Sequence, residues 1–129
     1  MRELIDKGRT VAVVGLSPKP DRDSHRVAAY LQAHGYRIIP VHPRAVEILG
    51  EPVYRRLEDI PVPVDIVYVF RRSEDVLPFV EAALRLQPRA IWLPLGVVSA
   101  EAAAVAAAHG ITAVMDRCML IEHGRILGA

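Results

Sequence analysis

Residues 10–26 read TVAVVGLSPKPDRDSHR, an apolar run of strand length followed by a glycine and a proline-rich polar loop. The first five residues are β-branched with one exception and apolar after the first, a pattern typical of a strand buried on both faces of a parallel sheet. Gly15 ends this strand, and the loop leads into a helix that Asp23 or Ser24 could cap. This order of segments predicts an α/β fold with a phosphate-binding loop.

The loop after the strand contains the groups that bind a phosphate. It supplies backbone N–H donors, the hydroxyls of Ser17 and Ser24, and the cations of Lys19 and Arg22. The free N–H groups and the positive dipole end of the following helix also favour an anion. We therefore predict that residues 15–24 hold a ligand phosphate. The simpler alternative is a strand-ending glycine followed by a solvated loop.

The loop departs from the dinucleotide-binding fingerprint G-x-G-x-x-G. Ser17 and Pro20 stand where the second and third glycines belong. The fingerprint also requires an acidic residue about 20 residues further on, to bind a ribose 2′-hydroxyl. Here the next predicted strand ends in VHPR, residues 41–44. An arginine at this edge suits a ribose phosphate and favours coenzyme A or NADP over NAD, unless Arg44 is only a solvated surface charge.

Length and charge limit the classes of protein that fit. The 129 residues, 52% of them hydrophobic, are enough for one domain with a core. The net charge is +1 and the cations are spread along the chain, so the sequence lacks the basic stripe that nucleic acid requires. No apolar run approaches the roughly 20 residues of a membrane helix, and the N-terminus lacks a signal-peptide core. With a single cysteine, these features predict a cytoplasmic protein without nucleic-acid or membrane partners.

The polar composition is lopsided. The chain has 14 Arg against 2 Lys, no Asn, 2 Gln and 10 Pro. Many thermostable proteins avoid thermolabile amides and favour prolines in loops, so this composition predicts a thermophilic or GC-rich bacterial source. One of the two lysines, Lys19, lies in the predicted phosphate loop.

Strand-like and helix-like segments alternate along the rest of the chain. After a short helical lead-in over residues 1–9, helices are predicted at 25–34, 73–86 and 99–109, and further strands at 36–41, 65–70, 89–93 and 111–115. Residues 45–60 are irregular and are interpreted as a connection across the sheet edge that includes one helical turn. This alternation predicts a Rossmann-like doubly wound parallel sheet of about five strands with helices on both faces, in one domain over residues 1–129.

Ligands of such sheets bind beyond the carboxyl ends of the strands, where the strand order reverses. In this chain those ends belong to four loops, at residues 15–19, 41–44, 70–72 and 94–96. We expect the four loops to converge on one crevice. Adjacent residues at a strand end point to opposite sides, so one of Arg71 and Arg72 should reach the ligand.

Four segments together resemble the CoA-binding domain family, small Rossmann-like proteins similar to the CoA-binding domain of the succinyl-CoA synthetase alpha subunit. They are VAVVGLSPKPDRDSHRVAAYLQAHGYRIIPVHPR, VDIVYVFRRSEDV, IWLPLGV and MDRCMLIEH, and they cover nearly the whole chain. The resemblance implies a protein that binds coenzyme A or an acyl-CoA as its small-molecule ligand. One departure is Pro94, because family members commonly carry an amide side chain in that turn.

The resemblance also implies roles for single residues. The ligand phosphates would be cradled by Gly15, Leu16, Ser17 and Lys19. The adenosine 3′-phosphate side would be lined by Val41, Pro43 and Arg44. The adenine and ribose would be contacted by Val69, Phe70 and Arg71, and the pantetheine arm would lie near Leu95 and Gly96.

Few residues suggest catalysis. The phosphohistidine of succinyl-CoA synthetases belongs to a second domain, so we interpret His42 as a loop residue near the ligand. Cys118 beside Arg117 could form a mixed disulfide with a ligand thiol, but a small buried residue is the favoured interpretation. No set of His, Cys, Asp and Glu has metal-ligand spacing.

We therefore interpret the chain as a CoA-binding protein without catalysis of its own, because no base, nucleophile or metal site is evident near the ligand. Two alternatives stay open: an NADP-binding Rossmann oxidoreductase or redox sensor, and an accessory subunit that supplies the CoA site of an acyl-CoA ligase. The sequence also leaves open a homodimer and a partnership with a CoA-using enzyme.

Overall fold

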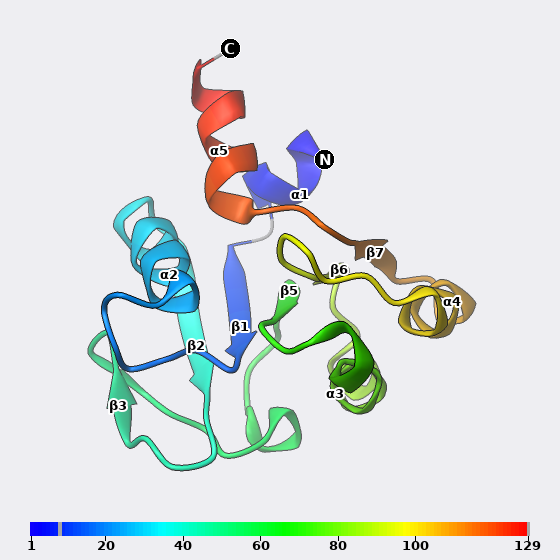
Figure 1. The fold of residues 1–129 in the computed structure, drawn as a ribbon, viewed down its shortest axis with the longest axis horizontal. Helices are drawn as coiled ribbons and strands as arrows, with labels where there is room; N and C mark the ends of the chain where they lie inside the picture. Colours follow the sequence, from blue (N-terminus) through cyan, green and yellow to red (C-terminus); the bar gives the residue numbers. More distant parts are fainter. Residues whose placement is uncertain (8, 129) are drawn as a thin grey trace.

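The computed structural model describes residues 1–7 and 9–128. Within them, the main sheet contains five parallel strands in the order β2-β1-β5-β6-β7. The strands are β1 (Thr10–Val14), β2 (Arg37–Val41), β5 (Ile66–Val69), β6 (Ala90–Trp92) and β7 (Thr112–Val114). This order confirms the predicted doubly wound parallel sheet (Figure 1).

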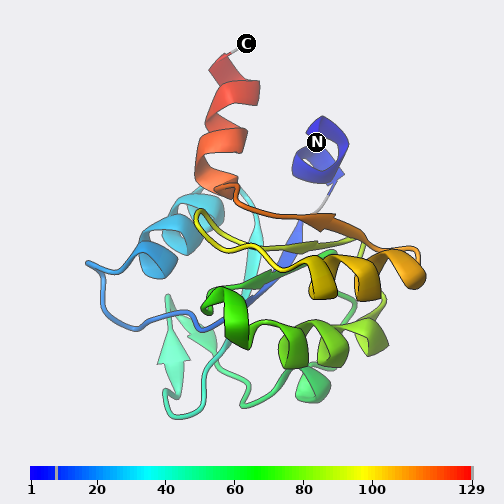
Figure 2. The same ribbon diagram turned by 45° about the vertical axis from the view of Figure 1, so that its right-hand side comes forward.

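Helices cover both faces of the sheet, as predicted. They are α1 (Arg2–Lys7), α2 (Asp23–Ala33), α3 (Leu77–Ala83), α4 (Ala100–Ala108) and α5 (Met119–Gly128). The first two and the last pack on one face, whereas α3 and α4 pack on the other (Figures 1 and 2). Residue 8, at the end of the predicted lead-in, lies outside the described residues. None of the helices described is both long and apolar enough to cross a membrane.

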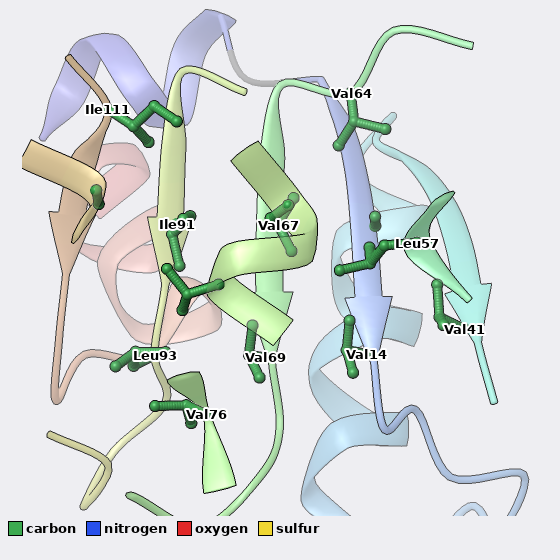
Figure 3. Packing of buried hydrophobic residues seen from close by; sticks show 14 of the residues in the cluster. Val14, Val41, Leu57, Val64, Val67, Val69, Val76, Ile91, Leu93 and Ile111 are labelled. Atoms are coloured by element: carbon green, nitrogen blue, oxygen red, sulfur yellow. The ribbon is translucent and has the colours of Figure 1, made fainter. Parts of the chain in front are cut away.

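Strand β1 contributes to two separate cores because successive side chains of a strand point to opposite faces. Val11 and Val13 join the cluster under α1, α2 and α5. Ala12 and Val14 join the cluster under α3 and α4, part of which is shown in Figure 3. All four side chains are at most 1% exposed. Burying a side chain such as valine contributes about 1.5–3 kcal/mol, which is why an uninterrupted apolar run suits this central position.

The structure contains two elements that were not predicted from the sequence. Helix α5 carries glycine at 124 and 128, and each glycine lowers helix propensity by about 1 kcal/mol relative to alanine. The helix is held by tertiary packing, with Met119 and His123 buried. The other element is a hairpin of β3 (Glu47–Ile48) and β4 (Glu51–Pro52) within the irregular segment. The helical turn predicted after it is present as a 3₁₀ turn, Leu57–Asp59.

The predicted helix over residues 73–86 is divided into three parts. A 3₁₀ turn, Ser73–Asp75, precedes α3, and a second one, Leu84–Leu86, follows it. Pro78 lies in the first turn of α3, where its missing N–H costs no hydrogen bond. The first of these turns directly follows the loop after β5 and places its side chains at the carboxyl end of the sheet.

The strand order reverses between β1 and β5. The connection after β1 leads to β2 on one side, and the chain then crosses to β5 on the other. The loops that leave β1 and β5 therefore separate from each other at this point, which is where open α/β sheets bind ligands. Helices α1 and α5 lie at the opposite end of the molecule (Figure 1).

Candidate functional site

A cleft of about 1220 Å³ lies at the carboxyl ends of the strands. Its walls come from the loops after β1, β2, β5 and β6, so the four loops do meet in one place. The predicted site residues that line it are Gly15, Ser17, Lys19, Arg22, Ser24, Arg44, Phe70, Arg71 and Gly96.

Gly15 joins the loops that follow β1, β2 and β5. Its φ is +79°, in the left-handed region that favours glycine. A Cβ atom added at this position would lie 2.5 Å from the carbonyl oxygen of Phe70. The N–H of Gly15 donates to the carbonyl of Val41 at 3.1 Å, and the N–H of Phe70 donates to the carbonyl of Val14 at 2.9 Å. The ends of β1, β2 and β5 can therefore approach one another closely because Gly15 has no side chain.

The loop after Gly15 is held by its own hydrogen bonds. The N–H of Ser17 donates to Oγ of Ser24 at 3.0 Å, and the N–H of Lys19 donates to Oγ of Ser17 at 3.1 Å. Nδ1 of His25 lies 2.9 Å from the carbonyl oxygen of Ser17. These bonds order the loop without a ligand, which reduces the entropy that binding would otherwise cost.

The prediction that Asp23 or Ser24 caps helix α2 is wrong. The N-cap residue is Arg22, and no side chain hydrogen-bonds the first turn there. The Ser24 side chain cannot cap because its residue lies inside the helix and its buried hydroxyl accepts from Ser17. The first N–H groups of α2 thus keep no side-chain partner at the wall of the cleft, where they suit an anion.

The charges of the cleft are unevenly paired. Arg72 lies 3.3 Å from the carboxylate of Glu74 and 3.0 Å from that of Asp75, and the hydrogen bond to Asp75 raises the pKa of Arg72. Arg71 instead stands over the ring of Phe79, 5.2 Å from its centroid. Of the two adjacent arginines, Arg71 is the one without a carboxylate partner among the described residues.

The sequence analysis placed no carboxylate in the cleft, but four line it: Asp21, Asp23, Glu74 and Asp75. Asp23 forms an ion pair with Arg26, just as Asp75 does with Arg72, and both pairs have the i, i+3 spacing that could have revealed them. Across the described residues, the cleft cations that pair with no carboxylate are Lys19, Arg22, Arg44 and Arg71. The cleft consequently has an excess of positive charge.

His42 lies in the wall between β2 and the hairpin. Its Nδ1 accepts the N–H of Arg44 at 3.0 Å and the N–H of Ala45 at 2.9 Å. Nη1 of Arg55 donates to the carbonyl of His42 at 3.1 Å. Burial and then the charges of Arg44, Arg71 and Arg55 lower the pKa of His42, so its imidazole is neutral near pH 7.

An aromatic stack supports the wall that Phe70 provides. The Phe70 ring stacks on Tyr68 with centroids 4.4 Å apart. The buried hydroxyl of Tyr68 accepts the N–H of Met119 at 3.2 Å, and burial raises the pKa of Tyr68. Cys118, next to Met119, is half-buried. Cys118 does not line the cleft. The start of α5 is thereby fixed to the strand that ends at the site.

Asp116 positions the turn after β6. Its Oδ1 accepts the N–H of Gly96 at 2.7 Å, and both residues have positive φ, +55° for Asp116 and +80° for Gly96. Aspartate tolerates this conformation better than most residues. The turn holds Pro94 and Val97 against the cleft.

Several predicted residues do not present a side chain to the cleft. Leu16, Val41 and Val69 are at most 5% exposed and pack in the two cores. The side chains of Pro43 and Leu95 are exposed outside its lining. A ligand in the cleft would therefore meet the first three only through their backbone, because the helical layers on both faces take up the side chains.

Comparison with known proteins gives relatives over nearly the whole chain. The family model of the CoA binding domain matches residues 9–124. The uncharacterized protein YneT of Bacillus subtilis (strain 168) is 40% identical over 123 residues, which cover 95% of this chain and 91% of that protein.

Solved structures share the fold. A hypothetical protein from Pyrococcus horikoshii OT3 matches with a TM-score of 0.94 and 36% identity, over 98% of this chain and 89% of that one. A Thermus thermophilus protein matches with a TM-score of 0.92 and 36% identity, over 97% and 95%. A dinucleotide-forming acetyl-coenzyme A synthetase from Ca. Korarchaeum cryptofilum, 20% identical, has the same fold in 27% of its chain, with a TM-score of 0.74 over 88% of this one.

Proposed function

This chain belongs to the CoA-binding domain family, and on that premise we propose that it binds coenzyme A or an acyl-CoA in the cleft at the switch point. The observation that supports this most is the set of cleft cations that have no carboxylate partner within residues 1–7 and 9–128, namely Lys19, Arg22, Arg44 and Arg71. Coenzyme A carries a pyrophosphate and a 3′-phosphate, whose negative charges such a set would neutralise.

The pyrophosphate occupies the loop after β1 in this proposal. Gly15 lets the backbone approach, and Ser17 and Lys19 contribute polar and charged contacts. Arg22 is the N-cap residue of α2, and Ser24 belongs to the first turn of that helix. Leu16 contributes through its backbone alone because its side chain is fully buried. The support for this placement is the uncapped start of α2 together with the preordered loop.

The rest of the ligand extends along the other strand ends. Arg44 binds the 3′-phosphate beside Pro43 and the backbone of Val41. Phe70 and Arg71, with the backbone of Val69, contact the adenine and ribose. The pantetheine arm runs past Gly96 and the exposed Leu95, where Pro94 leaves it without the amide contact of other family members.

Calorimetric titration of the purified protein tests this proposal. At one salt concentration, we expect coenzyme A and acetyl-CoA to bind at least tenfold more tightly than dephospho-CoA, a difference of about 1.4 kcal/mol. Arg44→Ala should abolish the difference. Arg72→Ala is the control and should preserve it, because that arginine is already paired with Glu74 and Asp75. Binding of NADP without binding of coenzyme A would overturn the proposal in favour of an oxidoreductase or redox sensor.

One observation favours a second candidate function. The same fold forms about a quarter of an acetyl-CoA synthetase chain, so this domain could supply the CoA site of a ligase whose catalytic groups lie on another chain. In that case the isolated protein would bind coenzyme A weakly, and it would copurify with a nucleotide-binding partner that restores tight binding.

A further inference from the structure

We propose that His42 is a phosphate-binding residue whose imidazole takes up a proton when a phosphomonoester dianion enters the cleft. This inference rests on the proposed function and extends it, because it assigns the recognition of the 3′-phosphate to a charge change in the protein as well as to fixed arginines. The ligand class it selects is a nucleotide with a terminal phosphate, in contrast to a diester or a pyrophosphate alone.

The hydrogen bonds of the imidazole fix which nitrogen carries the proton. Nδ1 accepts two backbone N–H groups, from Arg44 and Ala45, so it has no proton of its own. A neutral imidazole must then carry its proton on Nε2. No described residue hydrogen-bonds Nε2, although His42 lines the cleft. The two hydrogen bonds to Nδ1 hold the ring in place, so that its Nε2–H can donate to a ligand in the cleft.

The surroundings of His42 contain an excess of positive charge. Arg44 follows the same strand as His42, Arg55 follows the hairpin, and Arg71 comes from the loop after β5. Of the carboxylates of the same cleft, Asp23 pairs with Arg26, and Glu74 and Asp75 pair with Arg72. Asp21 alone has no ion-pair partner among the described residues, so it offsets only part of the charge of the arginines. Without a ligand, these arginines oppose a further positive charge on the imidazole.

A bound dianion reverses this balance. Phosphomonoesters carry about −1.5 to −2 charges near neutral pH, with a second pKa of about 6. Placed beside the arginines, such a group would outweigh their repulsion and raise the pKa of His42. The imidazole would take one proton from solvent onto Nδ1, with loss of the two backbone contacts that Nδ1 accepts, while its Nε2–H donates to the phosphate. The complex then holds one proton more than the free partners.

The alternative is that His42 only stabilises the turn. In that case its sole task is to accept the N–H groups of Arg44 and Ala45, which an asparagine side chain also does in turns of this kind. His42→Asn is therefore the matched variant, because it preserves the acceptor and removes both the Nε2 donor and the titratable group.

The test is calorimetry of the wild-type protein and His42→Asn with coenzyme A and dephospho-CoA, at about pH 7, where the free phosphomonoester is already mostly dianionic. Each titration is repeated in buffers of different ionisation enthalpy, so that the slope of heat against that enthalpy counts protons. For the wild type we expect net proton uptake with coenzyme A and none with dephospho-CoA. For His42→Asn we expect no uptake, about tenfold weaker binding of coenzyme A, and unchanged binding of dephospho-CoA and unchanged thermal unfolding.

Coenzyme A binding without proton uptake, or a variant that keeps the full preference for coenzyme A over dephospho-CoA, would overturn the inference and leave the proposed function standing. Failure of the wild-type protein to bind coenzyme A at all would overturn both. The two failures are thus separated by the wild-type titration alone.

Discussion

Replacement of Gly15 by alanine should destabilise the protein far more than the same change at other glycines with positive φ. The left-handed conformation itself costs an alanine about 1–2 kcal/mol. In addition, the new Cβ would lie 2.5 Å from the carbonyl oxygen of Phe70, a backbone atom at the end of a central strand. Overpacking of this kind costs about 1–3 kcal/mol. We therefore expect Gly15→Ala to lower the free energy of unfolding by about 2–5 kcal/mol, a large part of the roughly 5–15 kcal/mol of a typical domain.

Urea unfolding followed by circular dichroism measures this loss, and Gly110→Ala is its matched control. Gly110 has a φ of +70° but nothing within 4 Å of its Cβ position, so the variant should lose only the conformational part, about 1–2 kcal/mol. Gly15→Ala should also weaken the binding of coenzyme A, because Arg71 follows the displaced carbonyl. Equal destabilisation of the two variants would refute the idea that the close approach to Phe70 requires glycine.

Three further predictions concern single side chains, those of Tyr68, Ser24 and His123. Tyr68→Phe leaves the N–H of Met119 buried without an acceptor, so the free energy of unfolding should fall by about 1–3 kcal/mol in urea titration; an unchanged midpoint would contradict this. Ser24→Ala removes the acceptor of the Ser17 N–H and should cost about 1 kcal/mol of stability together with several-fold weaker binding of coenzyme A, whereas an intact affinity would show that the loop order does not matter. Burial lowers the pKa of His123, so the unfolded chain binds a proton before the folded one and stability should fall as pH drops below about 6.5; unfolding measured from neutral to acidic pH should show a smaller fall for His123→Gln.

Much of the fold follows from local patterns. The run before Gly15 indicated a buried parallel strand because its side chains are apolar on both faces, and β1 occupies those residues. Gly15 after the strand and Pro78 in the first helical turn reflect backbone geometry that involves only a few neighbouring residues. The alternation of strands and helices is likewise visible in short stretches of the sequence. The convergence of four loops followed from the parallel direction of the strands alone.

The tertiary structure decided what depends on partners distant in the chain. Arg71 and Arg72 are equivalent in the sequence. The 3₁₀ turn brings Glu74 and Asp75 to Arg72, whereas Arg71 stands over Phe79 and pairs with no carboxylate in the part of the chain that the structure describes. Ser24 looked like a helix cap until the fold placed it against Ser17. Helix α5 forms despite its glycines because other helices bury one of its sides. Local propensity is worth about 1 kcal/mol or less per residue, whereas burial and ion pairing act between groups that only the folded chain brings together.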